Sequence, residues 1–132
     1  MDYPTLEEVR ARFTGDRFAT ENGAVIEEIK EGYARCSMEI TPLHLNAAGA
    51  VMGGAIFTLA DFAFAVAANW NQSLRVSLTS QITYLSGARG KQLIAQARMV
   101  REGRSTCFYV TDVTDELGNA VAHITTSGFV KA

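Results

Sequence analysis

One carboxylate stands inside the most apolar stretch of the chain, and two glycines open that stretch. Gly53 and Gly54 begin residues 53–71, GGAIFTLADFAFAVAANWN, and Asp61 lies eight residues after Gly53. The first N–H groups of a helix have no partner within the helix, and glycines let a ligand oxygen approach them closely. The pattern indicates an oxyanion-binding site with Asp61 as a candidate base or nucleophile. The alternative is that the glycines only permit close packing and that Asp61 is a solvated or hydrogen-bonded residue.

Other reactive groups are few. His44 and His123 are the only histidines, and neither has an acidic or cysteine neighbour at ligand spacing, which disfavours a metal site. Cys36 and Cys107 fall in apolar alternating stretches and are typical of reduced core residues. The sequence has neither a Gly-x-Ser-x-Gly motif nor a Gly-x-x-x-x-Gly-Lys phosphate loop. We therefore expect no metal and no serine nucleophile of that class.

Length and charge narrow the class of protein. The chain of 132 residues is long enough for one domain with its own core. A net charge of −2 without a basic run argues against a general nucleic-acid surface. No charged-then-apolar leader is present, and Thr58, Asp61 and Asn69 interrupt the apolar stretch. We expect a cytoplasmic protein with a single domain over residues 1–132, and neither nucleic acid nor membrane as a partner.

The central stretch predicts a helix that is apolar nearly all round. Residues advance by about 100° each, which gathers one set of apolar side chains on one side. These are Ile56, Leu59, Ala63, Val66 and Trp70. Asp61 lies on the opposite side, and its neighbours there are Gly54, Thr58, Ala65 and Ala68, with Phe57 and Phe64 flanking it. Such a helix is typical of one wrapped by a sheet on one side and covered by a partner on the other.

The remaining elements must position this helix. Thr5 and Glu8 have the spacing of a capping box, which predicts a short helix to about Phe13. Residues 18–23 are expected to be irregular, and residues 41–52 form a loop into the central helix. Alternating polarity and turn residues predict six strands, at residues 24–30, 33–40, 75–85, 92–101, 105–114 and 120–130. This order indicates an α+β fold with a mostly antiparallel sheet and the long helix across one face.

The loop and the helix together carry a longer motif, His44-x-Asn46-x-x-Gly49-x-x-x-Gly53-Gly54-Ala55-x-x-x-Leu59-Ala60-Asp61. It resembles the motif of the hotdog-fold acyl-CoA thioesterases of the phenylacetic-acid degradation (PaaI-like) group. Residues 82–85, Gly90 and the turn 102–104 fall where that family has strands and a turn, so the resemblance covers nearly everything after about Phe18. It implies a sheet wrapped round the long helix, assembly as dimers and often tetramers, and metal-independent hydrolysis of R–CO–S–CoA to an acid and CoA. No cofactor is implied, because the CoA thioester is the substrate.

The resemblance also implies roles for individual residues. Asp61 would be the base or nucleophile, and the N–H of Gly53 would donate to the thioester carbonyl. Asn46 matches the family's site asparagine, and Ser77 matches a hydroxyl that helps to place the water in some members. The substrate contacts would fall on Met52, Gly54, Tyr84, Arg101, Gly103, Arg104 and Ser105. The two arginines among them would supply charge for the nucleotide phosphates.

One position departs from the family. Met52 stands before the glycine pair, where histidine is usual. Methionine cannot donate a hydrogen bond to a substrate oxygen or to Asn46, so we expect a changed rate or substrate range. Three phenylalanines of the helix predict a pocket for an aromatic or medium-length acyl group, namely Phe57, Phe62 and Phe64.

Two other functions fit the same fold. Hotdog dehydratases and hydratases act on acyl thioesters with a histidine and an acid, and no histidine lies on or beside this helix. A non-catalytic acyl-CoA-binding protein would keep the pocket without needing a carboxylate at the thioester. Turnover of acyl-CoA separates these functions from a thioesterase.

The spacing of Gly53 and Asp61 also predicts assembly. Their positions lie about 12 Å apart along a helix axis. A reacting carbonyl needs its donor and its base or nucleophile each within about 3 Å, a gap that one aspartate side chain cannot bridge. If both act on one thioester, Gly53 comes from one subunit and Asp61 from the other. Small neighbours allow the two helices to approach, namely Gly54, Ala65 and Ala68. We predict a homodimer with shared active sites, which can associate further as a dimer of dimers.

Overall fold

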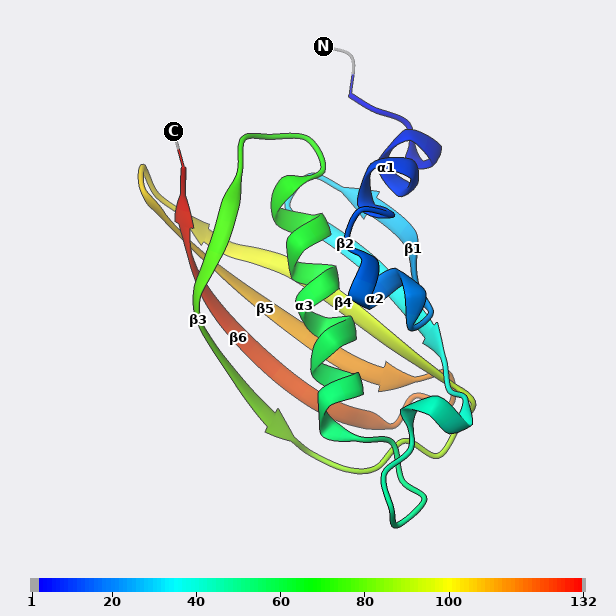
Figure 1. Cartoon of the computed structure of the whole chain (residues 1–132). Helices are drawn as coiled ribbons and strands as arrows, with labels where there is room; N and C mark the ends of the chain where they lie inside the picture. The colour runs from blue at the N-terminus through cyan, green and yellow to red at the C-terminus, as the bar shows by residue number, and fades with distance from the viewer. Residues whose placement is uncertain (1–2, 132) are drawn as a thin grey trace.

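The computed structural model describes residues 3–131 and shows a sheet wrapped around one long helix (Figure 1). In chain order the elements are α1 (Leu6–Phe13), α2 (Arg17–Glu21), β1 (Ala24–Lys30), β2 (Tyr33–Glu39), the 3-10 turn η1 (Pro42–His44), α3 (Gly53–Asn69), β3 (Arg75–Tyr84), β4 (Gln92–Glu102), β5 (Thr106–Asp115) and β6 (Ala120–Val130). The six strands form one sheet in the order β1-β2-β4-β5-β6-β3. Every neighbouring pair is antiparallel, which confirms the predicted α+β fold.

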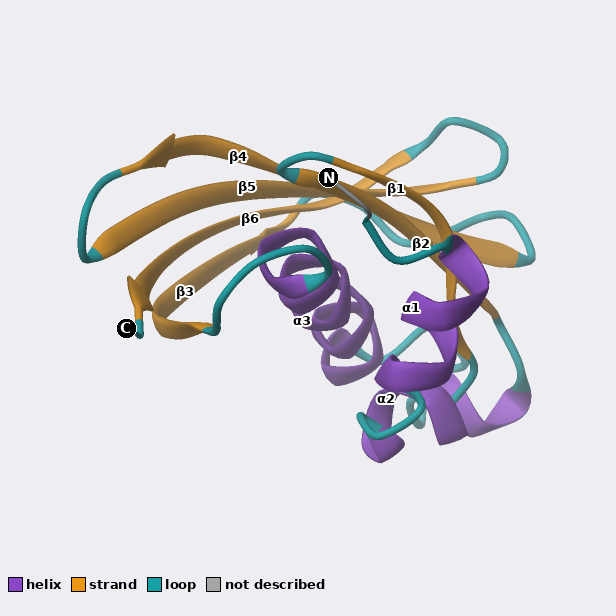
Figure 2. Cartoon of the chain, turned by 90° about the horizontal axis from the view of Figure 1, so that it is seen from above, coloured by secondary structure: helices purple, strands orange, loops and turns teal. Residues whose placement is uncertain are grey.

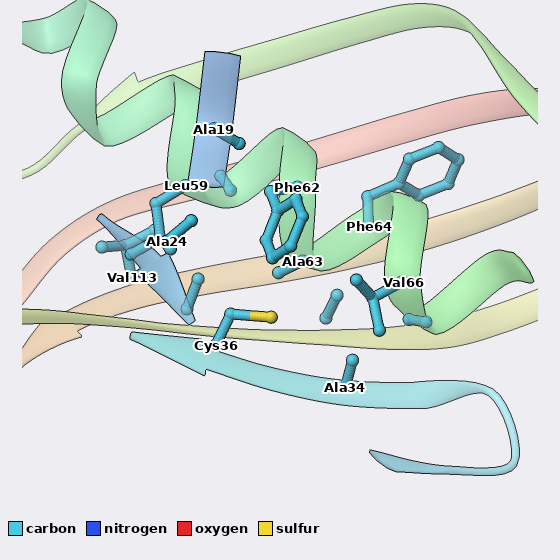
Figure 3. Packing of buried hydrophobic residues seen from close by; sticks show 14 of the residues in the cluster. Ala19, Ala24, Ala34, Cys36, Leu59, Phe62, Ala63, Phe64, Val66 and Val113 are labelled. Atoms are coloured by element: carbon cyan, nitrogen blue, oxygen red, sulfur yellow. The ribbon is translucent and has the colours of Figure 1, made fainter. Parts of the chain in front are cut away.

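The sheet curves round α3, which lies against its concave face (Figure 2). All five apolar residues predicted for one side of α3 are buried, with Leu59, Ala63 and Val66 completely inaccessible to solvent. The facing strands carry small side chains, and Ala34 and Cys36 of β2 point toward the helix (Figure 3). Small residues on the strands let the helix approach the sheet closely and exclude water.

The N-terminal segment contains one helix more than predicted. Thr5 and Glu8 form the expected capping box of α1. Residues 18–23 are expected to be irregular, but Arg17–Glu21 form the short helix α2, with Asp16 at its N-cap position and an ion pair between Arg17 and Glu21. Both helices lie beside α3 on the β1 side of the molecule (Figure 2). The side of α3 that faces away from the sheet is therefore covered in part by the chain's own N-terminal helices.

The two ends of β3 contact the two ends of α3. Asn69, at the end of α3, accepts a hydrogen bond from the N–H of Arg75 at 2.6 Å, and this link ends the helix two residues earlier than predicted. At the other end of β3, Tyr84 lies beside Gly53 at the start of α3. β3 is also an edge strand of the sheet.

Within residues 3–131, no helix has the length and apolar character needed to cross a membrane.

Candidate active site

The start of α3 presents unpaired N–H groups. Met52 occupies the N-cap position without a side-chain cap, and the first helical bond runs from the N–H of Ala55 to the carbonyl of Met52 at 3.0 Å. Within the described chain, the N–H groups of Gly53 and Gly54 donate to no other group. They carry the positive end of the helix dipole, so this end can bind an oxyanion.

Tyr84 fixes the peptide that follows Gly53. Its hydroxyl donates a hydrogen bond to the carbonyl oxygen of Gly53 at 2.9 Å. A Cβ atom added to Gly53 would lie 2.8 Å from the same hydroxyl, which is closer than real Cβ contacts allow. The structure thus brings together two of the predicted site residues, and a side chain at position 53 would have to displace the ring of Tyr84.

Asp61 lies two turns further along α3, on the side facing away from the sheet. Its side chain reaches solvent and lines a cavity of about 350 Å³, which we call the Asp61 cavity. The other residues lining it are Asp16, Arg17, Phe18, Ala19, Phe57, Thr58 and Phe62. The walls of this cavity remove water from the carboxyl group and raise the pKa of Asp61, and the nearby charge of Asp16 raises this pKa further. A carboxylate with a raised pKa is a stronger base once it is ionised.

A second cavity adjoins the start of α3. This Met52 cavity has a volume of about 270 Å³ and is lined by Phe18, Asn22, Met38, Leu43, His44, Met52, Gly54, Ala55 and Thr58. Phe18 and Thr58 line both cavities. The predicted lining by phenylalanines of α3 is only partly right. Phe57 and Phe62 line the Asp61 cavity, but the ring of Phe64 packs edge-on against Tyr109 in the core, with 5.2 Å between ring centroids.

Hydrogen bonds hold the loop before α3 in place. The side-chain oxygen of Asn46 accepts from the N–H groups of Ala48 at 2.9 Å and Ala50 at 3.1 Å. Nδ1 of the buried His44 accepts from the N–H of Thr41 at 3.0 Å, so its Nε2–H donates to the carbonyl of Asn22 at 2.7 Å. His44 therefore ties the loop to the end of α2. Among residues 3–131, no three His, Cys, Asp or Glu side chains are grouped to hold a metal ion.

The other predicted site residues lie elsewhere in the protomer. Ser77 is exposed on β3, seven residues before Tyr84, which corresponds to about 23 Å of extended strand. The turn from Arg101 to Ser105 lies at the opposite end of the sheet from Gly53 (Figure 1). There Glu102 pairs with Arg75 at 3.0 Å, beside the end of α3. One protomer therefore brings Tyr84 to Gly53, but neither Ser77 nor the arginine turn.

Residues 48–122 match the family model for the thioesterase superfamily, which is more than half of the chain. The chain belongs to the thioesterase superfamily. The chain is 41% identical over 100 residues to an Archaeoglobus fulgidus protein named "Putative esterase", an alignment that covers 75% of this chain but only 65% of that protein. It is 30% identical over 123 residues to the acyl-coenzyme A thioesterase PaaI of Escherichia coli K12, covering 92% of this chain and 88% of PaaI.

Solved structures agree with this assignment. The structure of E. coli PaaI matches with a TM-score of 0.87 at 26% identity, covering 97% of each chain. The crystal structure of a "Hypothetical Thioesterase Protein" with coenzyme A from Streptococcus pneumoniae TIGR4 matches with a TM-score of 0.81 at 27% identity, covering 91% of this chain and 97% of that one. The hotdog fold and the resemblance to the PaaI-like group are thus confirmed for this chain.

Sequence reasoning missed the residues of the candidate site that lie outside the motif. Phe18 lies in α2, Asp16 lies in the turn before α2, and Leu43 lies in η1. The available signal was the spacing of Arg17 and Glu21, which is that of an ion pair one helical turn apart, directly after an aspartate suited to an N-cap. Read together, these residues predict a short helix.

Proposed function

We propose that this thioesterase hydrolyses aromatic or medium-chain acyl-CoA to the free acid and CoA. The observation that carries the proposal is the pairing of free N–H groups at Gly53 and Gly54 with an apolar cavity beside them. Asp61, with its raised pKa, lies on the same helix. The name of E. coli PaaI as an acyl-CoA thioesterase and the coenzyme A in the S. pneumoniae structure support the substrate class.

In the proposed reaction, the N–H of Gly53 donates to the thioester carbonyl oxygen. The bond strengthens as that oxygen becomes negative in the tetrahedral intermediate, and one such donor is worth about 2.7–4 kcal/mol elsewhere. Ionised Asp61 either takes a proton from the attacking water or attacks the carbonyl carbon itself to give a mixed anhydride, which water then hydrolyses. On both routes the C–S bond breaks, the sulfur leaves as CoA thiolate and is protonated, and Asp61 is restored. The residues named supply every step, so the proposal includes neither a metal nor another cofactor.

We propose further that each active site is shared between two subunits. Gly53 and Asp61 lie about 12 Å apart along α3, too far for one thioester to contact both within a protomer. In an antiparallel pair of α3 helices, Gly53 of one protomer would face Asp61 of the other. The partner's α3 would then continue past Gly53, so that its C-terminal end lies beyond the start of the first helix. The arginine turn, residues 101–105, lies near that end of the molecule. It would then reach the phosphates of CoA from the partner, and Asn46, Met52, Gly54 and Tyr84 would contact the substrate from the Gly53 side.

One residue predicted for this interface does not fit there. Ala68 is completely buried within its own protomer, because it packs inside the chain's core. Gly54 is exposed and Ala65 is half-buried, so both can still lie at a contact between two helices. The contact would centre on the N-terminal half of α3, where Thr58 and Asp61 also face away from the sheet.

The test is thiol release from a panel of acyl-CoAs by the wild-type protein and by Asp61→Asn. We expect turnover by the wild type and loss of nearly all of it in the variant, with an unchanged melting curve because the side chain reaches solvent. Asp112→Asn is the matched control, since Asp112 pairs with His123 at 2.7 Å on β5 and β6, away from the site. Normal turnover by Asp61→Asn would contradict the role of Asp61, and tight binding without turnover by the wild type would instead identify an acyl-CoA-binding protein.

A further inference from the structure

Phe18 stands between the two cavities on the exposed side of α3. Its side chain is 75% exposed although it is aromatic, and it lines both the Met52 cavity and the Asp61 cavity. Thr58 of α3 is the other residue common to both cavities. The two cavities therefore adjoin along α3, where Phe18 and Thr58 form part of the wall of each.

We propose that Phe18 sets the length of the acyl group that this enzyme accepts, by closing the far end of the Met52 cavity. The inference rests on the proposed function. The acyl group would enter the Met52 cavity because that cavity adjoins Gly54, one residue from the N–H that binds the thioester carbonyl. Phe18 then meets the far end of the acyl group.

The walls of the Met52 cavity suit an apolar occupant. Leu43 and Met52, on its rim, are 72% and 56% exposed, so together with Phe18 three large, exposed apolar side chains line it. Covering them with an acyl group removes apolar surface from water, worth about 25 cal/mol for each Å². The volume of about 270 Å³ lies just below the range of roughly 300–1,000 Å³ of typical ligand pockets. A single ring or a short chain fits this space, whereas a long chain must displace Phe18.

The Asp61 cavity lies on the other side of Phe18 and Thr58. That space, of about 350 Å³, has apolar walls from Ala19, Phe57 and Phe62 besides its two aspartates. In the shared-site dimer it serves the second active site, because Asp61 of one protomer acts with Gly53 of the other. Phe18 thus keeps the acyl group of one site from extending into the other.

The test compares hexanoyl-CoA with palmitoyl-CoA in the wild type and in Phe18→Ala. Truncation joins the two cavities, so we expect the ratio of kcat/KM for palmitoyl over hexanoyl to rise by about tenfold or more, the scale of discrimination by methylenes in apolar pockets. Phe18→Trp keeps a large ring between the two cavities, so the ratio of kcat/KM for palmitoyl over hexanoyl should stay at or below that of the wild type. Leu117→Ala, which removes another exposed apolar side chain in the β5–β6 turn, should leave the ratio unchanged.

Binding of the non-hydrolysable thioether analogues of the same two CoA esters separates this inference from the proposed function. A gain in palmitoyl analogue affinity in Phe18→Ala, without turnover by any variant, would support the partition and contradict the thioesterase activity. Turnover with the same kcat/KM ratio in wild type and Phe18→Ala would contradict the partition and support the activity. Because Phe18 is largely exposed, the melting curve of the variant should match that of the wild type, which excludes misfolding as the cause of either result.

Discussion

The hydroxyl of Tyr84 donates a hydrogen bond to the carbonyl oxygen of Gly53 at 2.9 Å, and it would lie 2.8 Å from any Cβ atom at position 53. The end of the edge strand β3 therefore fixes the first peptides of α3, where the N–H groups are free. We predict that Gly53→Ala lowers kcat by about 100-fold or more, because the added methyl group must move either Tyr84 or the donor N–H. Steady-state kinetics with a melting curve checks this.

Tyr84→Phe provides the control for this prediction. It keeps the ring and removes only the hydrogen bond, so we expect a smaller loss of about two- to tenfold. The double variant Gly53→Ala/Tyr84→Phe should not recover, since the ring carbon Cζ would still lie 2.9 Å from the added Cβ. Near-normal turnover by Gly53→Ala would mean that this peptide does not stabilise the oxyanion.

Met52 offers a test of the departure from the family pattern. Its side chain is 56% exposed at the rim of the Met52 cavity. We predict that Met52→His changes kcat/KM or the acyl preference by about two- to tenfold, the value of one added hydrogen bond. The melting temperature should hardly change, because the position is exposed. Identical substrate profiles for the two proteins would show that this side chain does not touch the substrate.

The pH dependence of turnover should report on Asp61. This residue must be ionised to act, and both burial and the charge of Asp16 raise its pKa, so activity is lost on the acid side at a higher pH than for an ordinary aspartate. Arg17 also lines the cavity, but it pairs with Glu21. We predict that Asp16→Asn lowers the pKa of Asp61 and moves the acid limb of kcat/KM to lower pH, raising activity there relative to neutral pH by about twofold or more.

Glu31→Gln is the control for net charge, since Glu31 lies in the turn between β1 and β2. Its acid limb should coincide with that of the wild type. An acid limb that stays in place in Asp16→Asn, or that moves to higher pH, would contradict the coupling between the two aspartates.

The long elements were predictable because their patterns are set by one packing surface. The apolar side of α3 repeats over the whole helix, and β2, β5 and β6 each bury the residues of one face. α2 was missed because a helix of five residues, Arg17–Glu21, has little stability of its own and forms where it packs on α3 and β1. Its sequence signals were an aspartate and one ion pair, which are weak beside the periodicity of the other elements.

The candidate site was predictable only where one segment carries it. Gly53 and Asp61 share a helix, so their spacing alone indicated the chemistry. The acyl pocket was placed in part on the wrong residues, because the pattern of α3 cannot distinguish a phenylalanine that lines a cavity from one that packs in the core, as Phe64 does. Phe18 and Leu43 line one cavity with Gly54 only because the tertiary fold brings their segments together.

The shared active site is tested most directly by a mixed dimer of Asp61→Asn and Gly53→Ala chains. Each parent homodimer should be nearly inactive. In the purified heterodimer, one site combines the intact Gly53 of the first chain with the intact Asp61 of the second, and the other site carries both changes. We predict that the heterodimer recovers about half of the wild-type turnover per dimer. No recovery in a preparation shown to contain the heterodimer, or full activity in a demonstrated wild-type monomer, would contradict the account.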